Sequence, residues 1–576
     1  MGRPRECPAF LSLGLGNFCL HSKSLGLPIA TPRLDRSTMN AQKEETMGTA
    51  YVNARIYTVD DSNSWAEALL VEHGKIAAVG TAEEIRSAAP AGTQEVDLDG
   101  RMVMPGLHDA HSHLLYSGLK FHHEARLTPM ADAEQIIGEL SACCASHSLP
   151  QTEGDWVVGG EYHFSAFPEG RPDREFLDRA FPDRPIFLYD YSIHHGLANS
   201  KALELAGLDA ETEDPRGGRY IRRPGTRELT GELVEQATWK VKRAIPDYPE
   251  DVYRHALDWA ISVCNSVGIT SVQEASATRQ QLRALKDLDT DQSPLNIRLA
   301  AHLVWREEGV GMASLAELEQ VIDERATYRT PHVDTNFVKL FLDGAPLPPH
   351  FTEAGIVDDE VDRDNILVPE DELIEALQRF DSLGLRVKVH CAGTGSVRAA
   401  LDAYEQVRRR NGSNGPVHEI AHCTYIHDDD YARFAELDIV AEMSPAIWHV
   451  PEFNAVLSAG YRFATVHKAG IGMTIGSDWI ITPSPNLFPP LQGMLQRGAE
   501  SVDLAYALRL VTIEGARAVG RADSQGSLEP GKSADFIVLD QNLFDVPVDD
   551  IGQTHVLRTV FEGRTVYSAD EGSEAH

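Results

Sequence analysis

The amino-acid sequence predicts an α/β protein, a (β/α)8 TIM barrel with a composite β-sandwich. The chain of 576 residues is too long for one ordinary domain, but a large barrel with an accessory domain would fill it. Between residues 105 and 525, apolar runs alternate with longer helical stretches, which is typical of a parallel sheet with crossover helices. Short strand-like runs separated by turn residues at both ends of the chain predict a separate β unit.

The terminal strand-like runs form two sets that lie far apart in the sequence. The first set covers residues 50–104, and the second covers residues 526–567. Neither set has enough strands to bury the core of a sandwich alone. We therefore expect them to pack together as one composite β-sandwich, which the chain leaves before the barrel and rejoins after it.

Eight apolar runs in the central region are candidates for barrel strands. They are residues 186–189, 269–272, 297–303, 337–341, 386–390, 419–422, 439–443 and 473–478. This number fits a closed barrel better than an open sheet. Helices are clearest at 370–383 and 396–410, where apolar residues recur with a helical period. Residues 211–231 contain turn signals and no helical period, so we expect an inserted hairpin there.

The charge of the chain limits its partners. The formal net charge of −35 opposes binding to nucleic-acid phosphates and to anionic membrane surfaces. No run approaches the roughly 18 apolar residues of a membrane span. We expect a soluble protein that acts on a small-molecule substrate, with neither nucleic acid nor membrane as a partner. Barrels of this kind often form homo-oligomers, but no segment identifies an interface.

The seven cysteines lack the spacing of a disulfide framework or of a zinc knuckle. A reducing compartment is the simplest interpretation, and we expect a cytoplasmic protein. Residues 1–49 contain no uninterrupted apolar core of a signal peptide, so we expect a disordered tail. A transit peptide, or a true start at Met39 or Met47, is the alternative for this segment.

Two histidines separated by one residue follow the turn at Pro105 and Gly106. On an extended strand, residues i and i+2 face the same side, so His111 and His113 can present their imidazoles to one point. Two imidazoles that converge on one point can bind the same metal ion. The pair alone is a weak signal among 23 histidines, because two polar residues at a strand end show the same pattern. Further candidate ligands beside later strands strengthen the metal interpretation.

His390, His422 and Asp478 each end a strand-like run. The carboxyl ends of barrel strands form the rim where barrel enzymes place their chemistry. Each residue alone also fits a structural role, and Asp478 fits a helix or turn cap. In chain order, after the histidine pair and together with Lys339, they form a strong combined signal for a metal site.

Lys339 lies in the middle of an apolar strand-like run. A buried lysine is costly unless it is paired, deprotonated or modified. One interpretation is a lysine at a strand end that reaches solvent. The other is a carbamylated lysine, in which CO2 on the amine forms an anion able to bridge two cations. Lys388, two residues before His390, is the second candidate for this role.

Several motifs together resemble the amidohydrolase superfamily, and within it the YtcJ-like branch called amidohydrolase family 3. They are Pro105-Gly-Leu-His-Asp-Ala-His-Ser-His113, Asn199-Ser-Lys-Ala-Leu203, Val338-Lys-Leu-Phe-Leu-Asp-Gly344, Val389-His390, Ala421-His422, Gly476-Ser-Asp-Trp479 and Gly531-Lys-Ser-Ala-Asp-Phe536. The resemblance covers about residues 50–567 and implies a (β/α)8 barrel with a composite β-sandwich. It also implies one or two divalent metal ions, most often Zn2+. The implied ligands are His111, His113, Lys339, His390, His422 and Asp478.

The sequence departs from the family pattern in two rim loops. Where the family commonly has Val-His-Ala-Ile-Gly-Asp, this chain has Val389-His-Cys-Ala-Gly-Thr394, so a carboxylate is missing. After His422, the pair Cys423-Thr424 replaces the frequent Ala-Gln. Both changes bear on the substrate more than on the metal.

The implied ligand set suggests catalytic roles for Asp478 and His194. A divalent metal lowers the pKa of a bound water towards about 7 and polarises a carbonyl. Asp478 would take the proton from the attacking water and give it to the leaving amine. His194 lines up with a histidine that the family carries near its substrate pocket, and we assign it carbonyl polarisation or substrate contact. His195 is the alternative, and a histidine in a solvated loop fits the same pattern.

These residues predict a metal-dependent hydrolase that cleaves a carbon–nitrogen bond in a non-peptide amide, of the N-acyl or N-formyl amine type. Hydrolysis of a lactone, carbamate or ester-like bond is the alternative within the same superfamily. A catalytically inactive barrel used for binding is a third interpretation, but such a protein has no chemical need for the complete ligand set. Deamination is less favoured, because Cys-Ala-Gly-Thr follows His390 where mononuclear deaminases usually place a glutamate nearby.

Overall fold

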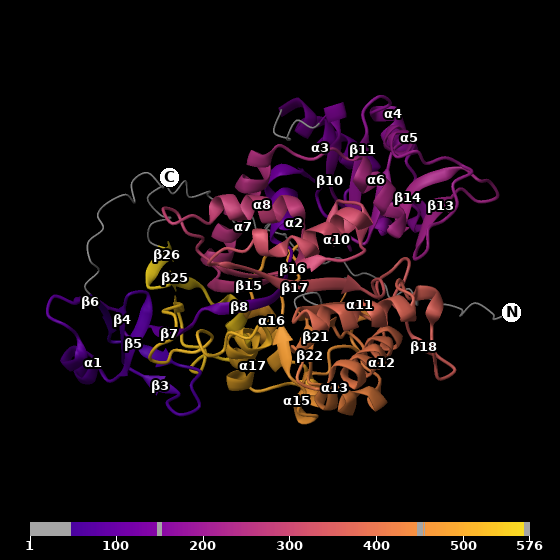
Figure 1. Ribbon diagram of the computed structural model, residues 1–576. Coiled ribbons are helices and arrows are strands. Elements are labelled where there is room, and N and C mark those ends of the chain that lie inside the picture. The colour runs from indigo at the N-terminus through magenta and orange to yellow at the C-terminus, as the bar shows by residue number, and fades with distance from the viewer. Residues whose placement is uncertain (1–47, 147–152, 446–452, 454–455, 570–576) are drawn as a thin grey trace, which may run out of the picture. The chain divides into compact units, whose positions relative to one another are not determined.

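The computed structural model describes residues 48–146, 153–445, 453 and 456–569 (Figure 1). Residues 1–47 of the expected tail lie outside the described residues. Among the described residues, no helix combines the length and the apolar character that crossing a bilayer requires.

Eight parallel strands form the barrel and confirm the predicted fold class. Their order around the sheet is β8, β15, β16, β17, β20, β21, β22 and β23. Their bounds are Leu107–Ser112, Ile269–Ala277, Arg298–Val304, Val333–Phe341, Arg386–Cys391, His418–His422, Ile439–Met443 and Met473–Ile475. These strands are buried over most of their length, as expected for strands covered by helices outside and by packed side chains inside.

Hydrogen bonds between the first and last strands close the barrel. The N–H of Asp478 donates to the carbonyl oxygen of His111 at 2.8 Å. The carboxylate of Asp109 accepts from both the N–H and the hydroxyl of Ser477, at 2.8 and 2.6 Å. The ends of β8 and β23 are therefore fixed side by side.

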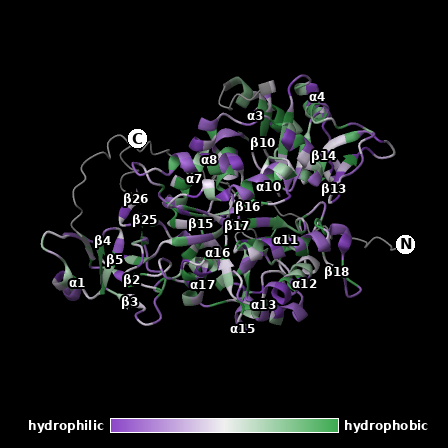
Figure 2. Cartoon of the chain, in the orientation of Figure 1, coloured by the Kyte–Doolittle hydropathy of each residue, from purple (hydrophilic) through white to green (hydrophobic). Residues whose placement is uncertain are grey.

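Amphipathic helices cover the outside of the barrel. The helices predicted at 370–383 and 396–410 are present as α11 (Glu370–Ser382) and α12 (Thr394–Asn411). On α11, Leu373, Leu377 and Phe380 are buried at the spacing of one helix face. Figure 2 shows hydrophilic and hydrophobic residues together on these helices.

Strands from both ends of the chain share one sheet. Its order is β26, β25, β24, β7, β2 and β3, and a second sheet has the order β5, β4, β1 and β6. The bounds of β1 to β7 are Thr49–Val52, Arg55–Tyr57, Trp65–Ala66, Ala68–Glu72, Lys75–Gly80, Gln94–Asp97 and Met102–Pro105. Those of β24 to β26 are Phe536–Leu539, Val556–Phe561 and Arg564–Ser568. One apolar cluster joins the two sheets, with the rings of Tyr51 and Phe536 centred 4.9 Å apart. In Figure 1 the indigo and yellow strands accordingly lie together.

A second six-stranded sheet is inserted between β8 and β15, and it corrects one prediction. Its order is β13, β14, β12, β11, β10 and β9. In sequence order, β9 to β14 span Ala125–Arg126, Val157–Tyr162, Ile186–Asp190, His195–Ala198, Gly218–Arg222 and Leu229–Glu235. The run at 186–189, predicted as a barrel strand, belongs to β11 of this sheet. A short apolar run buried on both faces has the same sequence pattern in either kind of sheet. The hairpin expected at 211–231 lies at one edge of this sheet, as β13 and β14.

Gly476, directly after β23, allows the closing strands to approach each other. A Cβ at this position would lie 2.3 Å from the Cβ of His111 and 2.6 Å from its backbone nitrogen. We expect Gly476→Ala to lower the free energy of unfolding by about 1–3 kcal/mol, because the added methyl group forces the strands apart. Thermal unfolding followed by circular dichroism measures this loss.

Gly138→Ala is the matched control for this substitution. Gly138 lies inside α3 (Ala133–Ser146), and a Cβ there meets nothing within 4 Å. Alanine is favoured over glycine in a helix by roughly 0.5–1 kcal/mol, so this variant should unfold at the same or a higher temperature. Equal unfolding temperatures for both variants would contradict the role of Gly476 in closure.

Candidate active site

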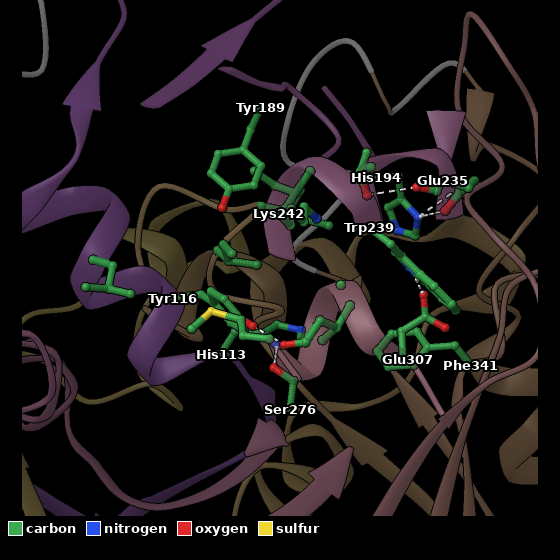
Figure 3. A pocket seen from close by; sticks show the side chains of 18 of the residues that line it. His113, Tyr116, Tyr189, His194, Glu235, Trp239, Lys242, Ser276, Glu307 and Phe341 are labelled. Atoms are coloured by element: carbon green, nitrogen blue, oxygen red, sulfur yellow. Dashed lines mark hydrogen bonds and ion pairs between the residues drawn. The ribbon is translucent and has the colours of Figure 1, made fainter. Parts of the chain in front are cut away.

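A cavity of about 400 Å³ lies at the carboxyl ends of the barrel strands. Its walls also include residues of the inserted sheet, of α6 (Trp239–Ala244) and of α9 (Glu308–Gly311). The structure places all seven residues that the sequence singled out in this wall: His111, His113, His194, Lys339, His390, His422 and Asp478. Figure 3 shows part of the lining, with His113 and Ser276 opposite Tyr189 and Lys242.

His111, His113 and Asp478 bring three ligand atoms together. The Nε2 atoms of His111 and His113 are 3.8 and 3.4 Å from Oδ1 of Asp478. The three ligand atoms lie within 4.8 Å of one another. Zinc binds nitrogen and oxygen ligands at about 2.0–2.2 Å, so ligands of one ion lie roughly 3–4 Å apart. This group fits the coordination sphere of one divalent cation.

His422 and His390 stand beside this group with different geometry. Nδ1 of His422 is 4.0 Å from Oδ2 of Asp478. The ring of His390 packs edge-on against His422 with centroids 4.4 Å apart, but its Nε2 lies 3.3 Å from the carbonyl oxygen of Gly344. The ligand atom of His422 belongs to a second group, with those of His111 and Glu442, whereas one nitrogen of His390 is directed at the main chain.

Burial keeps His111, His390 and His422 neutral. It lowers the pKa values of His111, His390 and His422 well below 6.5, and nearby positive groups such as Lys339 add to the effect. A neutral imidazole has a lone pair on one ring nitrogen, and this is the form that binds a metal. These three imidazoles are therefore in the form that can bind a metal at neutral pH.

The two candidate lysines are both fully buried, but their surroundings differ. Lys339 lines the cavity, and its Nζ is 3.3 Å from Nε2 of His111. Lys388 donates to the carbonyl oxygen of Ala110, and its Nζ lies 3.2 Å from Oε2 of Glu419. Burial and the charge of Lys388 both lower the pKa of Lys339. The geometry favours Lys339 as the amine that faces the cation site.

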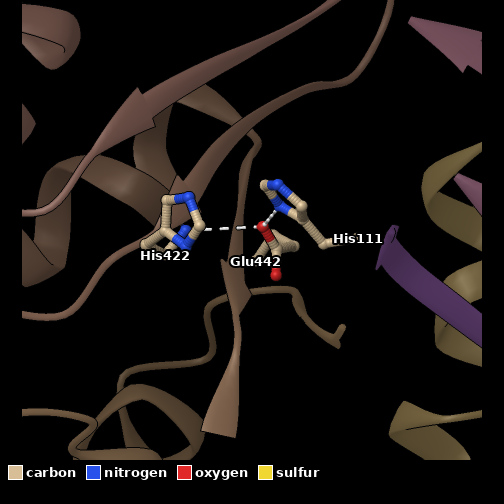
Figure 4. A group of neighbouring side chains, drawn as sticks. All are labelled: His111, His422 and Glu442. Carbon is tan, nitrogen blue, oxygen red and sulfur yellow. Dashed lines mark hydrogen bonds and ion pairs between the residues drawn. The ribbon is translucent and has the colours of Figure 1, made fainter. Parts of the chain in front are cut away.

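Glu442 of β22, which the sequence analysis missed, orients His111 (Figure 4). Its Oε2 lies 2.6 Å from Nδ1 of His111, and this distance is shorter than the separation of two ligands on one cation. We therefore interpret the contact as a hydrogen bond rather than as shared metal ligation. With its proton on Nδ1, His111 donates to Glu442 and turns the lone pair of Nε2 towards Asp478. Such carboxylate partners fix the orientation of metal-binding histidines.

Comparison with known proteins assigns the chain to a family. The amidohydrolase family matches residues 94–567, and an imidazolonepropionase-like composite domain of bacteria matches residues 68–91. The chain belongs to the amidohydrolase family. This confirms the resemblance seen in the sequence motifs.

Relatives of this amidohydrolase align over most of its length. It is 30% identical over 542 residues to the N-substituted formamide deformylase of Arthrobacter pascens, covering 89% of this chain and 97% of that protein. It is 25% identical over 538 residues to the putative amidohydrolase YtcJ of Bacillus subtilis (strain 168), covering 89% and 98%. An uncharacterised metal-dependent hydrolase of Pyrococcus furiosus shares the fold with a TM-score of 0.64 at 23% identity, covering 86% and 99%. The protein is therefore a hydrolase that acts on carbon–nitrogen bonds other than peptide bonds.

In this amidohydrolase, His194 is held by Glu235, another residue that the sequence analysis did not assign. Nδ1 of His194 lies 3.0 and 3.1 Å from the two carboxylate oxygens of Glu235. Burial opposes the charged ring of His194, but Glu235 outweighs burial and raises its pKa. His195 uses its Nδ1 to accept the N–H of Glu235 at 3.3 Å and does not line the cavity. Of the two histidines, His194 is the one that faces the substrate space.

Asp343 provides a carboxylate in the loop region where the family pattern is broken. It accepts the N–H groups of Ala392 and Gly393 at 2.9 Å and the hydroxyl of Ser396 at 2.6 Å. Its Oδ1 is 3.7 Å from Nε2 of His390. The loop that carries Thr394 in place of the usual aspartate is therefore held by Asp343, which follows the end of β17.

Three polar residues that line the amidohydrolase cavity adopt positive φ angles. The values are 68° for His422, 51° for Asp478 and 50° for Glu235. Residues other than glycine adopt this conformation at a cost of about 1–3 kcal/mol, and they concentrate at functional sites. The strain at the strand ends supports a functional rather than a purely structural role for these side chains.

The His194–Glu235 pair predicts a specific pH dependence of stability. Folding raises the pKa of His194, so the protonated ring stabilises the folded state. This stabilisation is complete below the pKa of the unfolded state, about 6.5, and disappears as the pH rises through the pKa of the folded state. Folding lowers the pKa of Glu235, so the ionised carboxylate stabilises the folded state. This stabilisation is present above the pKa of the unfolded state, about 4.5, and disappears as the pH falls through the pKa of the folded state. We expect Glu235→Gln to lower the free energy of unfolding by about 3 kcal/mol between pH 4.5 and 6.5, and by less at higher pH.

Thermal unfolding of both proteins in the presence of a chelator, from pH 4.5 to 8.5, measures this profile. Glu228→Gln, just before β14, is the control because the Glu228 side chain is half exposed where it pairs with Arg174 and Arg223. Glu228→Gln should change the free energy of unfolding by less than about 1 kcal/mol at every pH. If Glu235→Gln lowers the free energy of unfolding by the same amount at every pH, His194 and Glu235 do not form an ion pair.

Proposed function

We propose that this amidohydrolase uses one or two divalent metal ions, most simply Zn2+, to hydrolyse non-peptide amides of the N-formyl or N-acyl amine type. The observation that carries the proposal is the convergence of His111, His113 and Asp478 on one point of the cavity. The N-substituted formamide deformylase of Arthrobacter pascens, at 30% identity, supports the substrate class. No disulfide joins the described cysteines, which supports a reducing compartment such as the cytoplasm.

The residues present fit a metal site. His111, His113 and Asp478 would hold the first ion, with His422 close to them and His390 in the same wall. Lys339, as a carbamate, would add an anionic ligand that can bridge two ions. When bound, a divalent ion supplies activation of water and polarisation of the substrate carbonyl.

Asp478 is the residue proposed to move the proton. Its carboxylate lies beside both histidines of the motif, where it can accept the proton of the attacking water and transfer it to the leaving amine. Transfer to nitrogen is necessary because an amine leaves an amide as the neutral molecule. His194, whose pKa is raised by its pair with Glu235, would donate a hydrogen bond to the carbonyl oxygen or to another acceptor on the substrate.

Elemental analysis combined with a substrate panel tests the function. Protein purified without chelator and with bicarbonate should contain about one or two divalent ions per chain. It should hydrolyse N-formyl or N-acyl amines faster than lactones, carbamates or esters of similar size. Lactone hydrolysis without amide hydrolysis would replace the proposed reaction by the ester-type alternative. If the purified protein contains no metal and gains no hydrolytic activity when metal is added, the result would support a binding protein instead.

Asp478→Asn is the variant that tests the proton transfer. We expect kcat to fall by about 10²- to 10⁴-fold, because a general acid–base contributes this much to a rate. Metal content, measured by elemental analysis, should fall much less, since the asparagine oxygen can still serve as a ligand. An active Asp478→Asn protein would remove Asp478 from the role of base.

Lys339→Ala and Lys388→Ala distinguish the two candidate ligands. Lys339→Ala should lower the metal content per folded chain, with partial recovery on adding a short carboxylate that occupies the vacated space. Lys388→Ala should mainly lower the unfolding temperature, because it leaves the buried carboxylate of Glu419 without its partner. A loss of metal from the Lys388 variant alone would reverse the assignment.

A further inference from the structure

The part of the cavity beyond the metal-facing residues forms a chamber that the proposed reaction does not explain. We call it the cap chamber and define it by Tyr116, Glu124, Tyr189, Trp239, Lys242 and Glu307. Tyr116 comes from α2 (Leu114–Gly118), Tyr189 from β11, and Trp239 and Lys242 from α6. A formyl or small acyl group fills little of a cavity of about 400 Å³. The larger part of the substrate must therefore occupy this chamber.

Lys242 presents an ammonium group to the chamber without an ion-pair partner. Among the described residues, no carboxylate lies within 4.0 Å of its Nζ, which stands 5.4 Å from the ring centroid of Tyr189. Its neighbour Arg243, by contrast, is paired with Glu308 at 3.1 Å. Figure 3 shows Lys242 and Tyr189 on the same side of the cavity. A desolvated ammonium needs acceptors, and the chamber leaves space for a ligand to supply them.

Neither carboxyl group of the chamber forms an ion pair with Lys242, although both act on its charge at longer range: burial lowers the pKa of Lys242, and Glu307 and Glu124 oppose this effect. Oε1 of Glu307 accepts from Nε1 of Trp239 at 2.8 Å, and Oε1 of Glu124 accepts from the hydroxyl of Tyr248 at 3.2 Å. Burial raises the pKa of Glu307 to about 8 and that of Glu124 to about 7. Both groups therefore carry a proton in a large fraction of molecules near neutral pH. In this form each is a hydrogen-bond donor rather than an anion.

We propose that the cap chamber binds an anionic group of the substrate, a carboxylate at the far end of its amine portion, through Lys242. This inference rests on the proposed function and narrows its substrate class to N-formyl or N-acyl derivatives of amino acids whose carboxylate is remote from the scissile bond. The aromatic walls contact the apolar linker between the two polar ends. Lys242 is the residue that determines this specificity.

Three matched substrates test the proposal: N-formyl-6-aminohexanoate, N-formylhexylamine and N-formyl-1,6-diaminohexane. They share a flexible chain of five methylene groups and differ only at its end, which is a carboxylate, a methyl or a protonated aminomethyl group. We expect the highest kcat/KM for the carboxylate. Lys242→Met should reduce the ratio of kcat/KM between the carboxylate and the neutral substrate by about 10- to 100-fold, as expected for a charge-assisted contact. Lys242→Arg should retain a preference for the carboxylate.

Lys240→Met is the matched control, because Lys240 is exposed on the same helix and does not line the cavity. It should leave the ratio unchanged. A preference for the ammonium or methyl substrate in the unmodified protein overturns the proposal. So does a Lys242→Met protein that is folded and retains the ratio of the unmodified protein.

Calorimetric binding of the three product amines separates this proposal from the proposed function. Binding of 6-aminohexanoate that exceeds binding of hexylamine and is lost in Lys242→Met supports the chamber, even if no formamide is hydrolysed and the proposed function fails. Hydrolysis of all three formamides at equal rates, with equal binding of the amines, supports the function and overturns the anionic site. Absence of both hydrolysis and binding overturns both.

Discussion

The contact between the first and last barrel strands is the constraint on which the active site depends. Asp109 and Ser477, 368 residues apart, are joined by two hydrogen bonds, and His111 and Asp478 by a third. Burial raises the pKa of Asp109 to about 7, yet three donors from Ser477 and His111 satisfy its oxygens. Because these bonds fix the strand ends, the candidate ligand atoms of His111, His113 and Asp478 lie within 4.8 Å of one another.

The composite sheet extends the same constraint to the ends of the chain. β24 pairs with β7, which leads directly into the first barrel strand, so the C-terminal segment helps to position the strand that carries His111. Arg298 at the start of β16 donates to Ser533 at 2.9 Å and to Glu562 at 2.6 Å. The sheet therefore braces the amino ends of the barrel strands, while the cavity uses their carboxyl ends.

The barrel and most of the cavity residues were predictable because polar side chains end or interrupt apolar runs, and this pattern is visible without a structure. His194 was found only through the family resemblance. The strand at 186–189 was not predictable, since a buried strand has the same composition in a barrel and in an inserted sheet. Glu235 and Glu442 were missed because their roles depend on His194 and His111, which are distant in sequence. A carboxylate inside the apolar run at 439–443 was the available signal, of the same kind as Lys339.

The charges inside the barrel explain why a cation belongs at its mouth. Lys388 and Glu419 neutralise each other at 3.2 Å. Burial raises the pKa of Glu442 and lowers that of Lys339, so both favour their neutral forms. The ring nitrogens of His111 and His113 and the carboxyl group of Asp478 then face one point of the cavity, an arrangement suited to a divalent cation. A divalent ion bound there would stabilise the folded chain by mass action, so metal binding and folding are coupled.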